Sequence, residues 1–118
     1  MQDLRQRIYK MTLASVYPLY LQKIEKKGRT KQELDEVIFW LTGYDKQGLQ
    51  NQLDMEVNFE DFFAKAPAFP ANALKITGVI CGQRVEEIDD PVVRKVRYLD
   101  KLVDELAKGK DLSKILRP

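Results

Sequence analysis

Residues 30–43 read T-K-Q-E-L-D-E-V-I-F-W-L-T-G, and this stretch decides the fold class. Thr30 and Glu33 stand in the positions of a capping box, in which each side chain accepts a hydrogen bond from a free backbone N–H group of the first helical turn. Gly43 follows at a favoured helix stop. Apolar residues recur between them at the spacing of one helix face: Leu34, Val37, Ile38 and Leu41. The sequence therefore predicts an amphipathic helix here.

The chain on both sides repeats this pattern of a polar cap, a 3-4 apolar stripe and a Gly or Pro break. We expect further helices that start near Ser15, Asp45, Asn58 and Asp90, with a final turn after Asp111. Pro91 strengthens the assignment at Asp90, because proline is favoured at the first position of a helix. The sequence predicts an all-α fold, a compact bundle of five to six short helices that forms a single domain over residues 1–118.

Residues 75–83 allow two interpretations. A buried strand is favoured by the β-branched residues Ile76, Thr77, Val79 and Ile80. A helix is favoured by the 4-3-4-3 spacing of Leu74, Gly78, Cys81, Val85 and Ile88. We expect a central helix over about 73–88, buried on all sides, and the strand is the alternative.

Composition bounds the class of protein. The chain has 118 residues, of which 44% are hydrophobic and 32% charged, as in a folded soluble domain. No apolar run approaches the roughly 20 residues that cross a bilayer, so we expect no membrane partner. Cys81 is the single cysteine and cannot form an internal disulfide, which favours a cytoplasmic location. Its place on an apolar stripe predicts a buried, unreactive thiol.

The absence of histidine narrows the chemistry further. Ser-His-Asp and Cys-His catalysis both lack their base, and the commonest zinc ligand is missing. The sequence also lacks a Gly-rich phosphate loop followed by Lys and Ser or Thr. We therefore expect no catalytic residues, no metal and no cofactor. A carboxylate or lysine whose pKa is strongly shifted by burial remains the route by which an enzyme could still arise.

Charge is unevenly distributed along the chain. Residues 1–31 carry eight basic and two acidic side chains (8 − 2 = +6), and residues 32–61 carry one basic and eight acidic (1 − 8 = −7). Such segments could attract each other within one fold or between two copies. The densest basic patch comprises Lys23, Lys26, Lys27, Arg29 and Lys31. It suits a phosphate backbone, but a solvated helix face is the favoured interpretation.

Two further surfaces are candidates for binding. Phe39 lies about 140° from Leu34 around its helix, opposite the core stripe, and Trp40 lies beside it, so this pair predicts either an interface or internal packing. A charged surface for a small anionic ligand or nucleic acid is the second candidate: Arg84, Glu87, Arg97 and Tyr98. We expect a non-catalytic interaction module, in the simplest case a homo-oligomer, with binding of an anionic ligand or nucleic acid as the alternative.

Several runs resemble a bacterial family known as domain of unknown function 2200. They are Arg7–Met11, Ala14–Tyr20, Trp40–Tyr44, Ile76–Gly82, Arg84–Ile88 and Arg97–Leu102. The resemblance covers nearly the whole chain and implies a small cytoplasmic bacterial protein. It implies no activity, ligand or catalytic residue.

Overall fold

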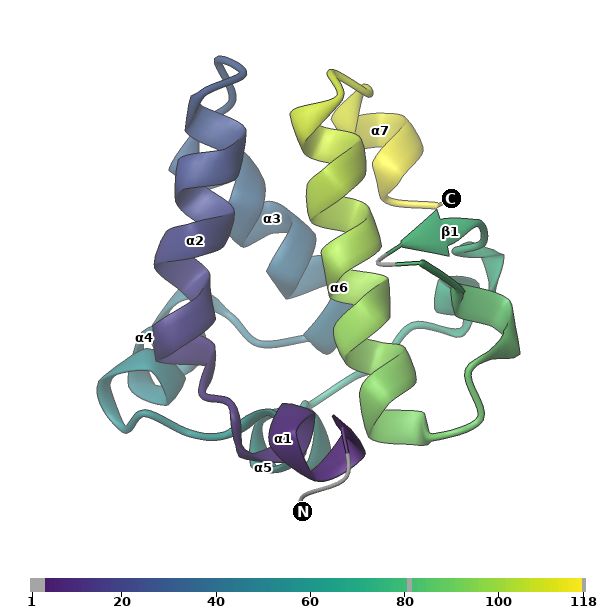
Figure 1. Cartoon of the computed structure of the whole chain (residues 1–118). Helices are drawn as coiled ribbons and strands as arrows, with labels where there is room; N and C mark the ends of the chain where they lie inside the picture. Colours follow the sequence, from purple (N-terminus) through teal and green to yellow (C-terminus); the bar gives the residue numbers. More distant parts are fainter. Residues whose placement is uncertain (1–3, 81, 118) are drawn as a thin grey trace.

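Helix α6 (Pro91–Ala107) is the centre of the fold in the computed structural model, which describes residues 4–80 and 82–117. It contacts α1 (Leu4–Lys10), α2 (Leu13–Glu25), α3 (Lys31–Thr42) and α5 (Phe59–Ala64), and Figure 1 shows these helices arranged around it. Its buried side chains recur at helical spacing, which explains its position: Val93, Val96, Leu99, Leu102, Val103 and Leu106.

The remaining elements are short. They are α4 (Lys46–Asp54), α7 (Leu112–Ile115), the 3-10 turns η1 (Ala71–Lys75) and η2 (Val85–Glu87), and the strands β1 (Val79–Ile80) and β2 (Gln83–Arg84). The described residues thus contain seven α-helices and one two-stranded antiparallel hairpin. This confirms the predicted all-α fold class. None of the described helices is long and apolar enough to cross a bilayer.

The ends of α3 show how local sequence fixes the helices. Both hydrogen bonds of the capping box between Thr30 and Glu33 are present, and Gly43 ends the helix in the left-handed conformation. The caps predicted at Asp45, Asn58 and Asp90 are also confirmed, since each side chain accepts a backbone N–H group of its helix. These signals are local, and the tertiary structure retains them.

The start of α2 differs from the prediction at Ser15. Thr12 is the cap, and its hydroxyl accepts the N–H group of Ser15. Thr12 also forms an isolated antiparallel bridge with Asn58, the cap of α5. The bridge joins the starts of α2 and α5, so a contact distant in sequence places both helices.

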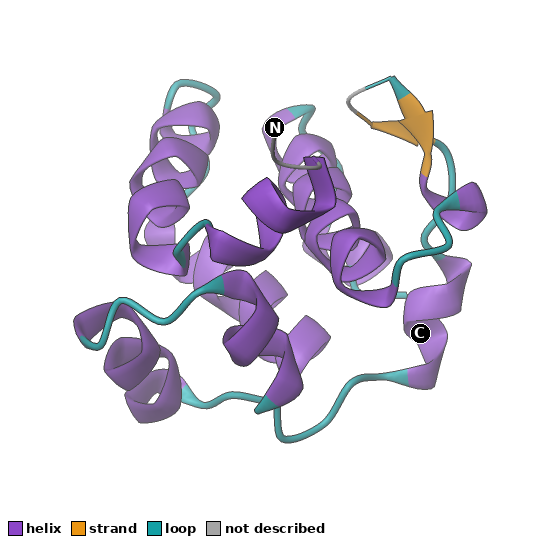
Figure 2. Ribbon diagram, turned by 60° about the horizontal axis from the view of Figure 1, so that its bottom comes forward, coloured by secondary structure: helices purple, strands orange, loops and turns teal. Residues whose placement is uncertain are grey.

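The predicted central helix over about 73–88 is wrong. This segment contains η1, the hairpin β1–β2 and η2, in which Val79 pairs with Arg84 and Ile80 with Gln83. Gly78 and Gly82 have φ values of 108° and 78°, which no right-handed helix contains. The hairpin lies at the edge of the molecule (orange in Figure 2), and α6 takes the central position instead.

Candidate functional site

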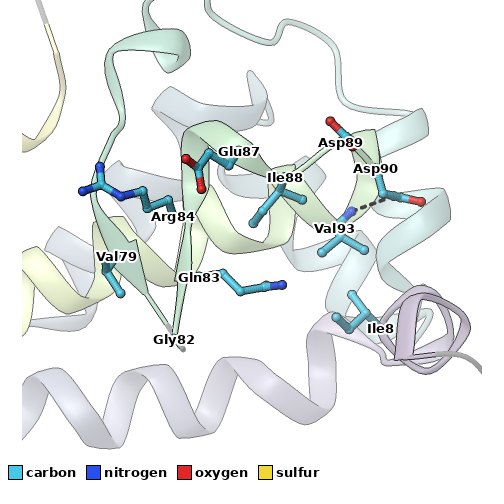
Figure 3. Close-up of a pocket in the computed structure, with 10 residues that line it drawn as sticks. All are labelled: Ile8, Val79, Gly82, Gln83, Arg84, Glu87, Ile88, Asp89, Asp90 and Val93. Atoms are coloured by element: carbon cyan, nitrogen blue, oxygen red, sulfur yellow. Dashed lines mark hydrogen bonds between the residues drawn. The ribbon is translucent and has the colours of Figure 1, made fainter.

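Two adjoining hollows lie on one side of α6, and together we call them the α6 groove. The first has a volume of about 630 Å³ and is shown in Figure 3. Its lining comes from α1, the hairpin, the η2–α6 connection and α6: Ile8, Val79, Gly82, Gln83, Arg84, Glu87, Ile88, Asp89, Asp90 and Val93. In Figure 3, Ile8 and Val93 point toward each other, whereas Arg84 points away from the hollow.

The second hollow lies between α1, α2 and α6 and has a volume of about 450 Å³. Its apolar walls are formed by Ile8, Met11, Val16, Leu19, Phe59, Ile80, Val96 and Val103. Its polar residues are Arg7, Tyr20, Lys23, Arg97 and Asp100. Ile8 lines both hollows, and the neighbouring hairpin residues Val79 and Ile80 line one each, so the two hollows adjoin.

Exposed hydrophobic side chains are concentrated on this groove. Among the side chains that the structure describes, five large hydrophobic ones are exposed. Met11 (44% exposed), Leu19 (61%) and Val79 (56%) line the groove, whereas Met55 (66%) and Leu74 (72%) line neither hollow. Single exposed apolar residues are ordinary, but a cluster beside an apolar hollow is typical of an interaction site.

The groove follows from the way α2 and the hairpin present their side chains. Helix α2 buries the stripe Val16, Tyr17, Tyr20 and Ile24, and Leu19 lies off this stripe, so it faces outward. Gly78 directly precedes β1 and Gly82 directly precedes β2, both with positive φ values that glycine adopts readily, and Val79 at the start of β1 is exposed. Leu19 and Val79 therefore remain available on the surface.

Several polar groups along the groove are already paired within the chain. Tyr20 donates a hydrogen bond to Asp100, and Arg97 forms an ion pair with the same carboxylate at 2.9 Å. Lys23 lies 3.3 Å from Asp104. Burial raises the pKa of Asp104, but the hydrogen bonds and charges of Lys108 and Lys23 outweigh it, so the pKa is lowered overall. The contacts of Tyr20 with Asp100 and of Lys23 with Asp104 join α2 to α6, whereas the pair of Arg97 and Asp100 lies within α6.

Other charges at the two ends of the groove are not used in this way. Lys26 and Lys27 are exposed at the end of α2, and Glu87 and Asp89 are exposed before the start of α6. In the described part of the chain, none of these four groups forms an ion pair. Lys23 lines the second hollow, and Lys26 and Lys27 follow it just beyond the end of α2, whereas Glu87 and Asp89 line the first hollow. The groove thus has lysines near one end and carboxylates at the other, with mainly apolar walls and the polar residues Arg7, Arg97 and Asp100 between them.

The predicted ligand surface does not form one site. Arg84 and Glu87 line the first hollow, and Arg97 lines the second. Tyr98 is buried and stacks on Phe69 with 6.1 Å between the ring centroids. Arg84 also lies 3.4 Å from Glu86, so its charge is partly balanced. Arg97 and Tyr98 are adjacent in a helix, where neighbours point about 100° apart, and this separates them.

The predicted basic patch is also divided by internal contacts. Arg29 binds Glu33 at 2.7 Å and donates hydrogen bonds to the carbonyl groups of Leu106 and Lys110. Lys31 forms an ion pair with Asp35 at 2.9 Å, and Lys23 is paired as described above. The two members that form no ion pair in the described part of the chain are Lys26 and Lys27, which follow Lys23 just beyond the end of α2 and line neither hollow.

Phe39 and Trp40 are half-buried and pack against the core cluster. Phe39 also lines a third hollow of about 370 Å³, whose other residues are polar: Lys31, Gln32, Asp35, Glu36 and Lys46. The structure thus gives this pair internal contacts as well as a partly exposed edge. The interface predicted at this face remains a prediction.

The thiol of Cys81 and a metal-binding cluster are the two remaining candidates for a chemical role. Cys81 lies outside the described residues. Among the residues that the structure does describe, no group of three or more His, Cys, Asp or Glu side chains is placed to hold a metal ion.

The groove residues Met11 and Leu19 were not predicted. The signal that could have identified Leu19 is its position off the apolar stripe of an otherwise amphipathic helix.

Comparison with known proteins adds the family. A family model described as "Uncharacterized protein conserved in bacteria (DUF2200)" matches residues 7–117. The chain is also similar to a solved structure titled "Crystal structure of uncharacterized protein SP1917", with 43% sequence identity and a TM-score of 0.89 over 98% of this chain and 94% of the other. No curated protein matches the chain. This chain therefore belongs to the DUF2200 family of uncharacterized proteins conserved in bacteria.

Proposed function

We propose that this chain is a non-catalytic protein-interaction module and that the α6 groove is its binding surface. One observation carries the proposal: three of the five exposed large hydrophobic side chains in the described part of the chain line this groove. A soluble protein gains nothing in the free state from exposing Met11, Leu19 and Val79 together, but each becomes favourable when a partner covers it.

The composition of the groove supports protein binding over binding of an anion. Eight of the residues that line its second hollow are apolar and five are polar, and a mixture of apolar and polar side chains is typical of interfaces between proteins. The first hollow is lined by three acidic residues, Glu87, Asp89 and Asp90, and by one basic residue, Arg84. An anionic ligand or a nucleic acid would meet repulsion there. An apolar segment of a protein, with its polar groups toward the rim, suits both hollows.

The energetic centre of this surface is Leu19. Full burial of a leucine side chain contributes about 1.5–3 kcal/mol, which corresponds to roughly 10- to 100-fold in affinity. A glutamate at this position would instead have to lose its hydration on binding. Because Leu19 is 61% exposed, its substitution leaves the fold intact.

A random-peptide phage library panned against the immobilised protein at low density tests the proposal. We expect selected peptides rich in apolar residues, whose fluorescence anisotropy shows binding at least about tenfold weaker for Leu19→Glu than for the original chain. Leu74→Glu is the matched control, since Leu74 is 72% exposed and lies outside the groove. Failure to select any peptide, or equal binding to the two variants, would refute the proposal.

A further inference from the structure

We infer that the occupant of the α6 groove is a second copy of this chain, seated across a two-fold axis that crosses the groove. This inference rests on the function proposed above and names the partner. A two-fold contact uses the same patch on both molecules, so apolar regions must meet apolar regions and charges must meet opposite charges. The exposed side chains of Leu19 and Val79 beside the hollows supply the first, and the charges near the two ends of the groove supply the second.

The apolar requirement is met by the middle of the groove. Leu19 of α2 and Val79 of the hairpin stand exposed on two of its sides, and Met11 stands at the start of α2. In Figure 1, α2 and the hairpin lie on either side of α6, with α1 below. A copy rotated by 180° places its own Leu19 against this apolar region, and so the same side chains are covered on both molecules.

The charge requirement is met by the two ends of the groove. Leu19 and Lys23 are four residues apart and share one face of α2, and Lys26 and Lys27 follow in the turn that ends the helix. At the other end lie Glu87 and Asp89, before the start of α6. Asp104, the partner of Lys23, and Asp90 are 14 residues apart on α6 (104 − 90), or about 21 Å along the helix axis.

A two-fold axis across the groove turns this polarity into attraction. It places the basic end of each molecule over the acidic end of its partner, so each contact between ends occurs twice. Lys27 and Asp89 are one pair that can meet in this arrangement, because each is exposed and forms no ion pair within the described part of the chain. A partner of a single charge sign would be repelled at one of the two ends.

Sedimentation equilibrium of the full chain gives the first test. We expect a dimer at a protein concentration of about 100 µM, where a micromolar dimer is mostly assembled. Leu19→Glu should raise the dissociation constant at least about tenfold, by removing an apolar contact twice per dimer. Leu74→Glu, the matched exposed leucine outside the groove, should leave it unchanged.

Charge reversal tests the antiparallel arrangement itself. Lys27→Glu and Asp89→Lys should each weaken self-association, because each places like charges at both contacts between ends. An equimolar mixture of the two variants should associate again, since both contacts in the mixed dimer join opposite charges. The double variant Lys27→Glu/Asp89→Lys should recover self-association for the same reason. Lys65→Glu, an exposed lysine outside the groove, is the control.

The outcomes separate the partner from the function. A chain that stays monomeric at about 100 µM overturns the second copy as occupant. If Leu19-dependent peptides are still selected, the interaction module stands with another protein in the groove. A dimer that ignores Leu19→Glu, or variants that fail to recover in the mixture, also overturns the inference. If Leu19-dependent peptides are absent as well, both proposals fall.

Discussion

Gly43 and Gly82 have nearly the same backbone conformation and opposite surroundings. Their φ values are 79° and 78°, in the left-handed region that glycine adopts most readily. A Cβ atom at Gly43 would lie 2.6 Å from the backbone nitrogen of Ala68, whereas a Cβ atom at Gly82 would meet nothing within 4 Å. At the end of α3, glycine is required both by the backbone conformation and by the close approach of Ala68. In the hairpin, glycine is favoured by the backbone conformation alone.

This difference distinguishes the two sides of α6. The α3 side is packed against residues 66–69, and the N–H group of Ala68 donates a hydrogen bond to the carbonyl group of Thr42 at 3.0 Å. The hairpin side has an exposed Val79 and space around its turn. The hairpin wall of the α6 groove therefore has fewer close contacts around its turn than the end of α3 has around Gly43.

The largest expected effect is on the α3 side. Gly43→Ala should lower the free energy of unfolding by about 3 kcal/mol, because a left-handed alanine and a forced shift of the Ala68 backbone both cost energy. Urea denaturation followed by circular dichroism measures this loss. A loss below about 1 kcal/mol would show that residues 66–69 move freely, and would remove the contrast between the two sides.

A smaller effect is expected in the hairpin. Gly82→Ala should lower the free energy of unfolding by about 1 kcal/mol, the cost of the left-handed conformation with no steric clash. The same denaturation experiment, run beside Gly43→Ala, gives the comparison directly. Gly82→Asn is a suitable control, since asparagine tolerates this conformation better and should lose less. Equal losses at the two glycines would contradict the distinction drawn above.

The smallest effect concerns the start of α3 and depends on pH. The hydrogen bond from Arg29 lowers the pKa of Glu33 below its usual value of 4.5. A carboxylate whose pKa is depressed in the folded state stabilises the protein above its unfolded pKa, and this contribution is lost as the pH falls through the folded pKa.

Glu33→Gln should therefore be less stable than the original chain at pH 7 and should match it more closely below pH 4.5. Thermal melts across this range measure the gap. Glutamine preserves the capping box, so the variant isolates the charge from the cap. A gap that is constant from neutral to acidic pH would mean that the charge of Glu33 contributes nothing.

How far the sequence predicted the fold depends on whether the signal was local. The cap at Thr30, the stop at Gly43 and the proline at Pro91 each act within one helical turn, and the structure retains all three. The helix predicted over about 73–88 was wrong because the 4-3-4-3 pattern on which it rested included Gly78 as part of a helix face. Its glycines instead adopt positive φ values, and this is visible only once the chain is folded.

The candidate site was harder to predict than the fold. The predicted ligand surface included Arg97 and Tyr98, which are adjacent in sequence, but Arg97 lines the groove and Tyr98 stacks on Phe69. The groove itself depends on where the hairpin lies relative to α2, because residues about 60 apart in sequence, such as Leu19 and Ile80, line the same hollow. Leu19 alone carried a readable signal, as an apolar residue outside the stripe of its own helix.

The central position of α6 has a consequence for how the protein is made. Helix α6 begins at Pro91, so the ribosome has already released most of α1 to α5 before the helix on which they pack exists. At about 5–20 residues per second, the earlier helices spend several seconds with their apolar faces uncovered. The core is therefore completed late in synthesis, because the earlier helices have no α6 to pack against until residues 91–107 have been made.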